Sequence, residues 1–144
     1  MKLQLDTESM IDCFFENTHL LGIVAPMEPY KFCWHLNNKL NYDFRTRHDL
    51  EIQMRKQNRN YYFSIYEYKV PQGKMSHFLY NNRYDGEFLL PELKHFDFLW
   101  LIKYEEADPR KITKIIDTMR SIPVLQMVSE LSTHLIKNRG NLCF

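Results

Sequence analysis

The sequence predicts an α+β fold in which two helices pack on one face of a mainly antiparallel sheet. Its composition favours strands, because ten Phe, nine Tyr and two Trp accompany only four Gly in 144 residues, and large aromatic side chains suit the half-buried surface of a sheet. Two amphipathic helical segments are separated by a series of short strand-like segments. This order places several strands of one sheet between two helical connections.

The first third of the chain predicts a strand followed by a helix. Residues 19–25 are an apolar run with β-branched side chains that ends at Pro26, which is typical of a buried strand and a turn. Residues 29–40 have helical periodicity, and Pro29 suits the first helical position because its missing N–H costs nothing there. At roughly 100° per residue, the large and apolar side chains share one broad side, which we expect to face the core: Tyr30, Phe32, Cys33, Trp34, Leu36 and Leu40.

The middle of the chain predicts antiparallel strands joined by hairpins. The expected strands cover residues 48–53, 61–70, 75–80 and 88–90. Asn, Asp, Gly and Pro separate them, and tight turns favour these residues. Residues 97–103, with the sequence DFLWLIK, are the most apolar run in the chain and therefore predict a central strand.

The last third predicts a second helix and a final strand. Asp108 is a suitable N-cap, and Pro109 follows it at the first helical position. Residues 124–131 are expected to return as a strand beside residues 97–103 in a right-handed β-α-β unit, with a third helix over the same residues as the alternative. The core positions of the second helix recur at i, i+3, i+4 and i+7: Ile112, Ile115, Ile116 and Met119.

The order of these elements predicts a ferredoxin-like two-layer sandwich with additional strands, formed by a single domain over residues 1–144. A net charge of +1 makes nucleic acid an unfavoured partner, because no overall field would attract it. No apolar stretch reaches the length of a membrane span, so we expect no membrane association. Three widely spaced cysteines without a Cys-x-x-Cys pair favour reduced thiols in a cytoplasmic protein.

The strand pattern predicts a sheet that is apolar on both faces. In a two-layer sandwich the face away from the helices is normally polar, yet large side chains occupy both alternating sets of positions in residues 61–70 and 97–103. The C-terminal segment, a second copy of the chain or another partner must cover the second face. We expect that face to bind protein, either in a homodimer or with another chain, through Phe96, Trp100, Ile102, Tyr62, Tyr66 and Tyr68.

No group of residues predicts catalysis, a metal site or a bound cofactor. The four glycines are isolated, so no phosphate-binding loop is expected. Glu92 and His95 have metal-ligand spacing, but a di-iron bundle needs that pair twice. Cys33 and His35 lie two positions apart in the predicted helix and therefore point to different faces. A binding role is favoured over an enzymatic one.

An RNA-binding domain is the alternative function. Arg59, Tyr61, Phe63 and Tyr66 match the basic and aromatic positions of the RNA-recognition octapeptide, whose aromatic side chains stack on bases. The glycine position of that motif holds Asn60, and its small-residue position holds a tyrosine. A solvated loop followed by an aromatic strand explains the same residues.

The segment Leu90-Pro91-Glu92, followed by Asp97-Phe98, resembles the signature of the bacterial IPExxVDY family. The similarity extends to residues 30–40, 48–50, 61–68 and 137–144, so it covers nearly the whole chain. The signature has Ile at the position of Leu90, Val at that of Phe96 and Tyr at that of Phe98, and four residues separate Glu92 from Asp97 where the family name has three. The resemblance implies no particular activity, substrate or cofactor.

The motif residues have a structural and a functional interpretation. In the first, Pro91 drives Leu90 toward an extended conformation and begins a turn. Glu92 then satisfies backbone N–H groups in that turn, and Asp97 fixes the start of the central strand. In the second, Glu92 and Asp97, with Leu90, Pro91 and Phe98 around them, form a contact point for a partner.

Overall fold

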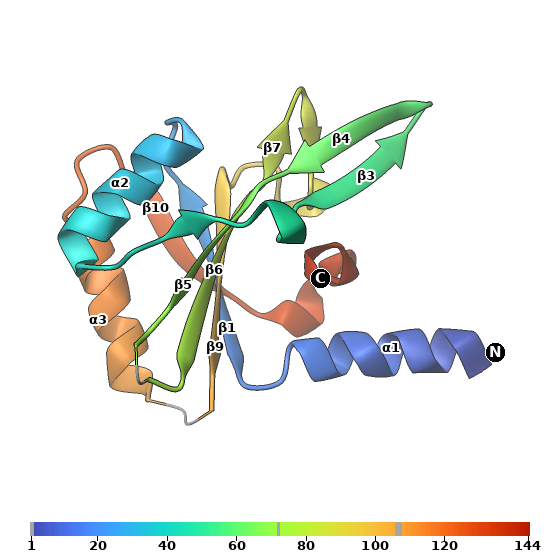
Figure 1. The fold of residues 1–144 in the computed structure, drawn as a ribbon, viewed down its shortest axis with the longest axis horizontal. Helices are drawn as coiled ribbons and strands as arrows, with labels where there is room; N and C mark the ends of the chain where they lie inside the picture. The colour runs from blue at the N-terminus through green and yellow to red at the C-terminus, as the bar shows by residue number, and fades with distance from the viewer. Residues whose placement is uncertain (1, 72, 106–107) are drawn as a thin grey trace.

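The computed structural model describes residues 2–71, 73–105 and 108–144, and its main element is a six-stranded antiparallel sheet of order β10-β1-β9-β6-β5-β2 (Figure 1). Two short hairpins, β3 with β4 and β7 with β8, stand outside this sheet. The strands are β1 (Thr18–Val24), β2 (Arg45–Thr46), β3 (Ile52–Lys56), β4 (Arg59–Phe63), β5 (Ile65–Lys69), β6 (Met75–Asn81), β7 (Arg83–Tyr84), β8 (Glu87–Phe88), β9 (Phe98–Tyr104) and β10 (Met127–Leu131).

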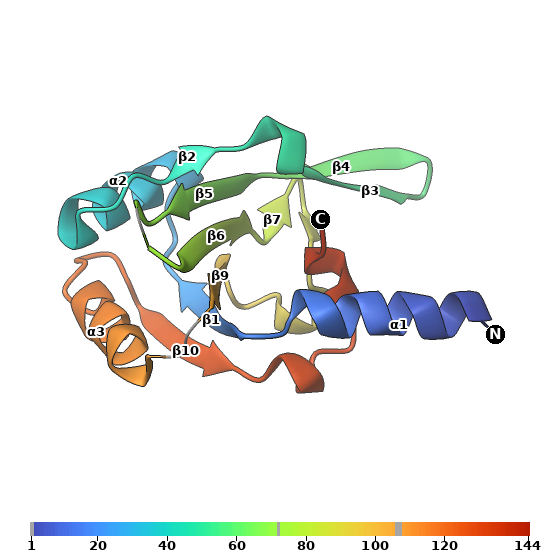
Figure 2. The same cartoon turned by 60° about the horizontal axis from the view of Figure 1, so that its bottom comes forward.

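Two helices cover one face of the sheet, as the sequence predicts. Helix α2 (Pro29–Leu40) follows β1 and helix α3 (Pro109–Met119) follows β9, and Figure 2 shows both on the same side of the strands. The Asp108 carboxylate accepts a hydrogen bond from the backbone N–H of Arg110 at 3.1 Å, so it is the expected N-cap. With the strand order β10-β1-β9-β6, this is the ferredoxin-like arrangement, and β5 and β2 extend it at one edge.

Helix α1 (Lys2–Phe14) is an element that the sequence analysis did not anticipate. It runs outward from the sheet on the side away from α2 and α3 (Figure 1). In the part of the chain that the structure describes, no helix has both the length and the apolar character needed to cross a membrane.

Several strands differ from the prediction in extent or partner. Residues 48–53 begin with a 3₁₀ turn, His48–Leu50, before β3. Residues 61–70 form two strands, because the chain changes sheets at Ser64: β4 pairs with β3, whereas β5 pairs with β6. Residues 88–90 contribute only the end of β8. Residues 127–131 are a strand and not a helix, but this strand pairs with β1 and so lies one strand away from β9.

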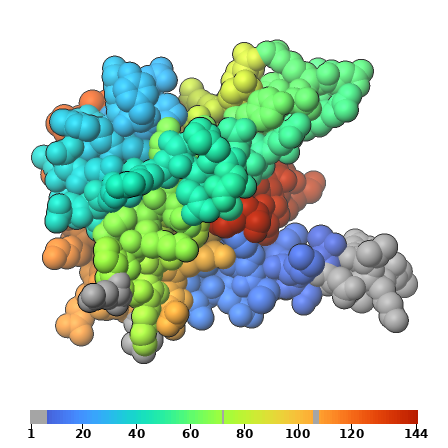
Figure 3. Space-filling view, viewed as in Figure 1, coloured from blue at the N-terminus to red at the C-terminus, as the bar shows by residue number. Residues whose placement is uncertain are grey.

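The chain itself covers both faces of the sheet. The core under α2 and α3, called here the helix-side core, contains Leu21, Ile23, Phe32, Leu36, Leu79, Phe98, Trp100, Ile102, Ile112, Ile115 and Met119. The core on the opposite face, called here the second core, contains Phe15, Leu20, Phe63, Ile65, Phe78, Tyr80, Leu89, Leu90, Phe96, Leu99, Leu101, Ile136 and Leu142. Figure 3 shows the C-terminal segment, in red, filling the space between α1 and the β3–β4 hairpin.

The aromatic interaction face predicted from the strands is therefore not an exposed surface. Trp100 and Ile102 are fully buried in the helix-side core, and Phe96 is 3% exposed in the second core. The chain's own helices and C-terminal segment occupy the positions that a partner would need. The other three side chains are divided between environments: Tyr66 and Tyr68 are half-buried beside the helix-side core, and Tyr62 is exposed on β4.

One buried hydrogen bond ties the C-terminal segment to the sheet. The hydroxyl of Tyr80 on β6 donates to the carbonyl oxygen of Leu142 at 2.7 Å. Tyr80 and Leu142 are both fully buried, so water cannot replace the bond if it is lost. The carbonyl lies in the last 3₁₀ turn, Arg139–Leu142.

We expect Tyr80→Phe to lower the free energy of unfolding by about 1–3 kcal/mol, because it leaves the buried carbonyl of Leu142 without a donor. Urea unfolding followed by circular dichroism measures the change. Tyr62→Phe removes the same hydroxyl from an exposed ring and should change stability by less than about 0.5 kcal/mol. Equal losses in the two variants would contradict the structural role of the Tyr80 hydroxyl.

His77 is a buried titratable group in the helix-side layer. Its Nδ1 accepts a hydrogen bond from Nε1 of Trp100 at 3.1 Å, so the neutral ring carries its proton on Nε2, which has no hydrogen-bond partner among the described residues. The rings of Tyr42 and Tyr68 contact the imidazole. Burial lowers the pKa of His77 to about 3, because the charged form would lose its hydration.

We expect His77 to make stability fall in mild acid. Its folded-state pKa is below its unfolded value, so its contribution is complete above the unfolded pKa and is lost as the pH falls toward the folded pKa. Below about pH 6 the slope is about 1.4 kcal/mol per pH unit. His77→Asn keeps an acceptor for Trp100 and should flatten the slope in urea titrations between about pH 7 and 5. The control variant His134→Asn, at an exposed histidine, should keep the same dependence of unfolding free energy on pH. An unchanged slope in His77→Asn would show that His77 does not cause this dependence.

Candidate functional site

The motif residues lie in a loop, residues 89–97, that Asn82 holds in place. Asn82 is fully buried, and its Nδ2 donates to the carbonyl oxygens of Leu93 at 3.1 Å and Phe96 at 3.0 Å. Its Oδ1 accepts from the backbone N–H of Leu90 at 2.9 Å. The side chain thereby satisfies three backbone groups of a loop that has no strand partner of its own. Asn82 lies between the predicted strands of residues 75–80 and 88–90, where the sequence predicts a turn, and nothing in the local sequence indicates this role.

Asp97 joins the start of β9 to the end of β1. Its Oδ2 accepts from the backbone N–H of Ala25 at 2.9 Å, and its backbone N–H donates to the carbonyl oxygen of Ile23 at 2.8 Å. Its Oδ1 lies 3.0 Å from Nη2 of Arg83. Asp97 is only 8% exposed, so these partners replace the water that a carboxylate normally keeps. This geometry agrees with the structural interpretation of Asp97.

The other motif residues also contact the protein itself. Leu90 is extended, with φ −119° and ψ 95°, and Pro91 begins the 3₁₀ turn Pro91–Leu93, as predicted. Oε2 of Glu92 accepts from the backbone N–H of Asn138 at 2.9 Å. Glu92 therefore holds the C-terminal segment and not its own turn. Phe98 stacks on Phe32 of α2 with ring centroids 4.6 Å apart.

Phe96 explains the glycine in the middle of β1. A Cβ atom built on Gly22 would lie 2.8 Å from three carbons of the Phe96 ring. Because that ring is buried in the second core, it has little room to move, and only glycine allows this close approach. The motif loop is thus fixed to the sheet by polar bonds at Asn82 and Asp97 and by a ring packed on backbone.

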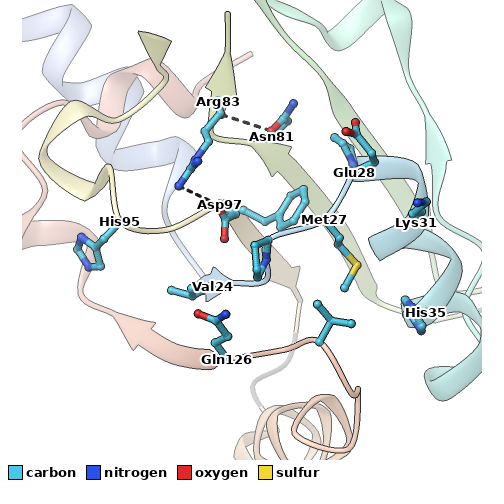
Figure 4. Close-up of a pocket in the computed structure, with 14 residues that line it drawn as sticks. Val24, Met27, Glu28, Lys31, His35, Asn81, Arg83, His95, Asp97 and Gln126 are labelled. Atoms are coloured by element: carbon cyan, nitrogen blue, oxygen red, sulfur yellow. Dashed lines mark hydrogen bonds and ion pairs between the residues drawn. The ribbon is translucent and has the colours of Figure 1, made fainter. Parts of the chain in front are cut away.

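A groove of about 930 Å³ opens beside Asp97 and is called here the α2 groove. Figure 4 shows Asn81, Arg83 and Asp97 on one side of it and Lys31 and His35 of α2 on the other. Its apolar lining comes from Val24, Met27, Phe98 and Val124.

The groove supports binding better than catalysis. The carboxylate of Asp97 is already engaged by Arg83 and the backbone of Ala25, and His35 and His95 lie at opposite sides of the groove (Figure 4). Acid–base or nucleophilic catalysis needs such groups within hydrogen-bond reach of one another. Among the described residues, no group of three or more His, Cys, Asp or Glu side chains is placed to hold a metal ion.

Two large aromatic side chains stand exposed on α2 next to this groove. Tyr30 is 63% exposed and Trp34 is 61% exposed, which corrects the prediction that both face the core. Phe32, Cys33 and Leu36 are the residues of α2 that are buried. Tyr30 and Trp34 are one helical turn apart and form a continuous stripe. The Trp34 ring contacts that of His35, with centroids 5.0 Å apart, so the stripe reaches the groove.

The four residues of the RNA-recognition pattern do not form one exposed platform. Arg59 makes an ion pair with Asp85 and lies over the half-buried ring of Tyr61. Phe63 is fully buried in the second core, and Tyr66 packs beside the helix-side core on the other side of the sheet. The change of sheet at Ser64 separates residues that a single strand would have aligned.

No model of a protein family matches this chain, and no curated protein matches it. The resemblance to the IPExxVDY signature therefore stays a prediction. Function has to be inferred from the α2 groove and the side chains around it, because an α+β fold of this kind supports many unrelated functions.

We expect amide substitutions to separate the two acidic motif residues. Asp97→Asn removes the charge that pairs with Arg83 and should lower the free energy of unfolding by about 1–3 kcal/mol. Glu92→Gln keeps an oxygen that can accept from Asn138, and Glu92 is exposed, so its effect should stay below about 0.5 kcal/mol. Urea unfolding measures both. A neutral Asp97→Asn variant that loses a partner would favour the functional interpretation instead.

Proposed function

We propose that this chain is a protein-interaction domain that binds another protein through the α2 groove and the stripe of Tyr30 and Trp34. The observation that carries the proposal is the exposure of two large aromatic side chains on consecutive turns of α2, the helix whose residues Lys31 and His35 line the groove. Trp and Tyr are the residue types that most often dominate the energy of protein–protein interfaces. A role confined to folding would not require both rings to face water.

The chemistry of the groove supports the same proposal. Half-buried Met27 and exposed Val124 contribute apolar contact area to its lining. Charged groups of both signs surround them, with Glu28 and Lys31 at one edge and the Arg83–Asp97 pair at the other. An apolar centre inside a polar rim is the usual anatomy of an interface. We infer that the partner inserts an apolar segment flanked by polar groups.

Three further expectations belong to this proposal. The three cysteines are free thiols, which supports a reducing compartment such as the cytoplasm. Membership of the IPExxVDY family is part of the proposal and rests on the sequence signature alone, Leu90-Pro91-Glu92 followed by Asp97-Phe98. RNA binding remains the alternative, but the burial of Phe63 and the ion pair of Arg59 give it no support.

We expect the double variant Tyr30→Ala, Trp34→Ala to lose its protein partner. The full chain would be used for affinity capture from its native cells, and recovery of the main co-purifying protein should fall at least about tenfold. The folded state should change by less than about 0.5 kcal/mol, because both side chains are exposed. Leu135→Ala is the control, since Leu135 is 86% exposed and belongs to the C-terminal part of the chain.

Light scattering over a range of concentrations identifies the case in which the partner is a second copy. If the wild-type chain is a dimer and the double variant is a monomer, the proposed surface is supported and the partner is a second copy of the chain. Equal recovery of the partner by the double variant and by Leu135→Ala would overturn the proposed surface. Capture of RNA in place of protein would favour the alternative function.

A further inference from the structure

A second cavity lies at the other end of α2 from the N-terminal turn that borders the groove. It has a volume of about 460 Å³ and is enclosed by the end of α2, the turn between β5 and β6, and one side of α3. It is called here the lysine basin, after the four lysines that line it: Lys39, Lys74, Lys111 and Lys114. Its volume falls within the range of small-molecule sites, about 300–1,000 Å³.

The lysine basin concentrates positive charge at its edge. None of the described residues that line it is acidic. Lys39, Lys111 and Lys114 are exposed and form no ion pair with a described residue. The acidic residue Asp117 of α3 is paired with Arg120 instead, at 3.6 Å. A concave surface with one sign of charge raises the local concentration of oppositely charged ligands.

The inner wall of the lysine basin is aromatic and apolar. The rings of Tyr42 and Tyr68 stack with centroids 4.6 Å apart and an interplanar angle of 25°, and Met75 and Ile115 line the cavity beside them. Burial, together with the neighbouring Tyr68, raises the pKa of Tyr42 to about 12, so its hydroxyl stays protonated and can donate a hydrogen bond. A fully hydrated inorganic anion would make no use of this wall.

Buried side chains hold the two tyrosine rings of the aromatic wall in place. Both tyrosine rings contact the imidazole of His77, which is fully buried and is itself bonded to Trp100. His77 is neutral at physiological pH, since burial lowers its pKa to about 3. The positive charge of the basin therefore comes from the lysines at its edge, and the stacked rings form a preformed flat surface behind them.

We propose that the lysine basin binds a small aromatic anion, in which a flat ring packs against Tyr42 or Tyr68 and a carboxylate, sulfonate or phosphate lies among the lysines. Each half of such a ligand matches a feature of the basin: the ring matches the aromatic wall, and the anionic group matches Lys39, Lys111 and Lys114, which have no carboxylate partner among the described residues. This site is separate from the α2 groove, so it does not depend on the proposed protein partner.

The probe for this proposal is 1-anilinonaphthalene-8-sulfonate, an aromatic anion whose fluorescence rises on binding. The control probe is N-phenyl-1-naphthylamine, which has the same rings without the sulfonate. We expect the folded chain to bind the anionic probe at least about tenfold more tightly than the neutral one. We also expect added salt to weaken binding of the anionic probe only.

Charge reversal locates the site. Lys111→Glu with Lys114→Glu should weaken binding of the anionic probe at least about tenfold. The matched control is Lys94→Glu with Lys137→Glu, which changes the net charge equally at two exposed lysines on the motif loop and the C-terminal segment; it should change binding by less than about twofold. Near-ultraviolet circular dichroism checks that each variant keeps its packing, because partly unfolded proteins also bind this dye.

Probe binding tests the lysine basin independently of the α2 groove, which protein capture tests. Tyr30→Ala with Trp34→Ala should leave binding of the anionic probe unchanged, even where it abolishes capture of a protein. If the Lys111 and Lys114 variant does not fold, Lys114→Gln alone should still weaken binding about threefold. The proposal is overturned if the neutral probe binds as tightly as the anionic one, if both charge-reversal pairs act equally, or if the folded chain binds neither probe.

Discussion

Strand β9 is buried on both faces, and the rest of the fold depends on this requirement. Residues Phe98 to Ile102 are at most 1% exposed, so side chains that point in either direction need apolar neighbours. Helices α2 and α3 meet the requirement on one side. On the other side it is met by segments from three parts of the chain: the end of α1, the loop before β9 and the C-terminal 3₁₀ turns.

The loop before β9 connects the two cores, and polar contacts set its position. The side chain of Asn82 forms hydrogen bonds with the loop backbone at Leu90 and Phe96, and Asp97 ties the end of the loop to β1. The next residue, Phe98, packs against α2 in the helix-side core, whereas Phe96 packs in the second core. A short segment thus passes from one core to the other. This is why residues that resemble a family signature have so many contacts within the chain.

The parts of the fold that could be predicted are those with local signals. Pro29 and the pair Asp108-Pro109 mark the starts of α2 and α3, and the apolar run of residues 97–103 marks the central strand. Helix α1 (Lys2–Phe14) contains no proline, and it contacts Arg139 and Phe144, which are far away in the sequence. The change of sheet at Ser64 could not be predicted either, because the residues on both sides of it favour strands.

The candidate site could be predicted only in part, because its features depend on tertiary packing. Helical periodicity put Tyr30 and Trp34 on a broad apolar side, but the sheet covers only the part of α2 that includes Phe32 and Leu36. Asp97 was identified as a motif residue, whereas the partnership with Arg83 and the adjoining groove needed the fold. The lysine basin combines residues from α2, α3 and a β-turn, so no local sequence pattern could indicate it.

The junction of α1 with the C-terminal segment has a consequence for biosynthesis. Phe14 packs against Phe144 with ring centroids 5.2 Å apart, and Arg139 makes an ion pair with Asp12. Domains begin to fold while the ribosome is still making them. The helix-side core has all its strands and helices once β10 has emerged, but the second core lacks Ile136 and Leu142 until residue 142 leaves the exit tunnel. The second core is therefore the last part of the fold that synthesis can complete.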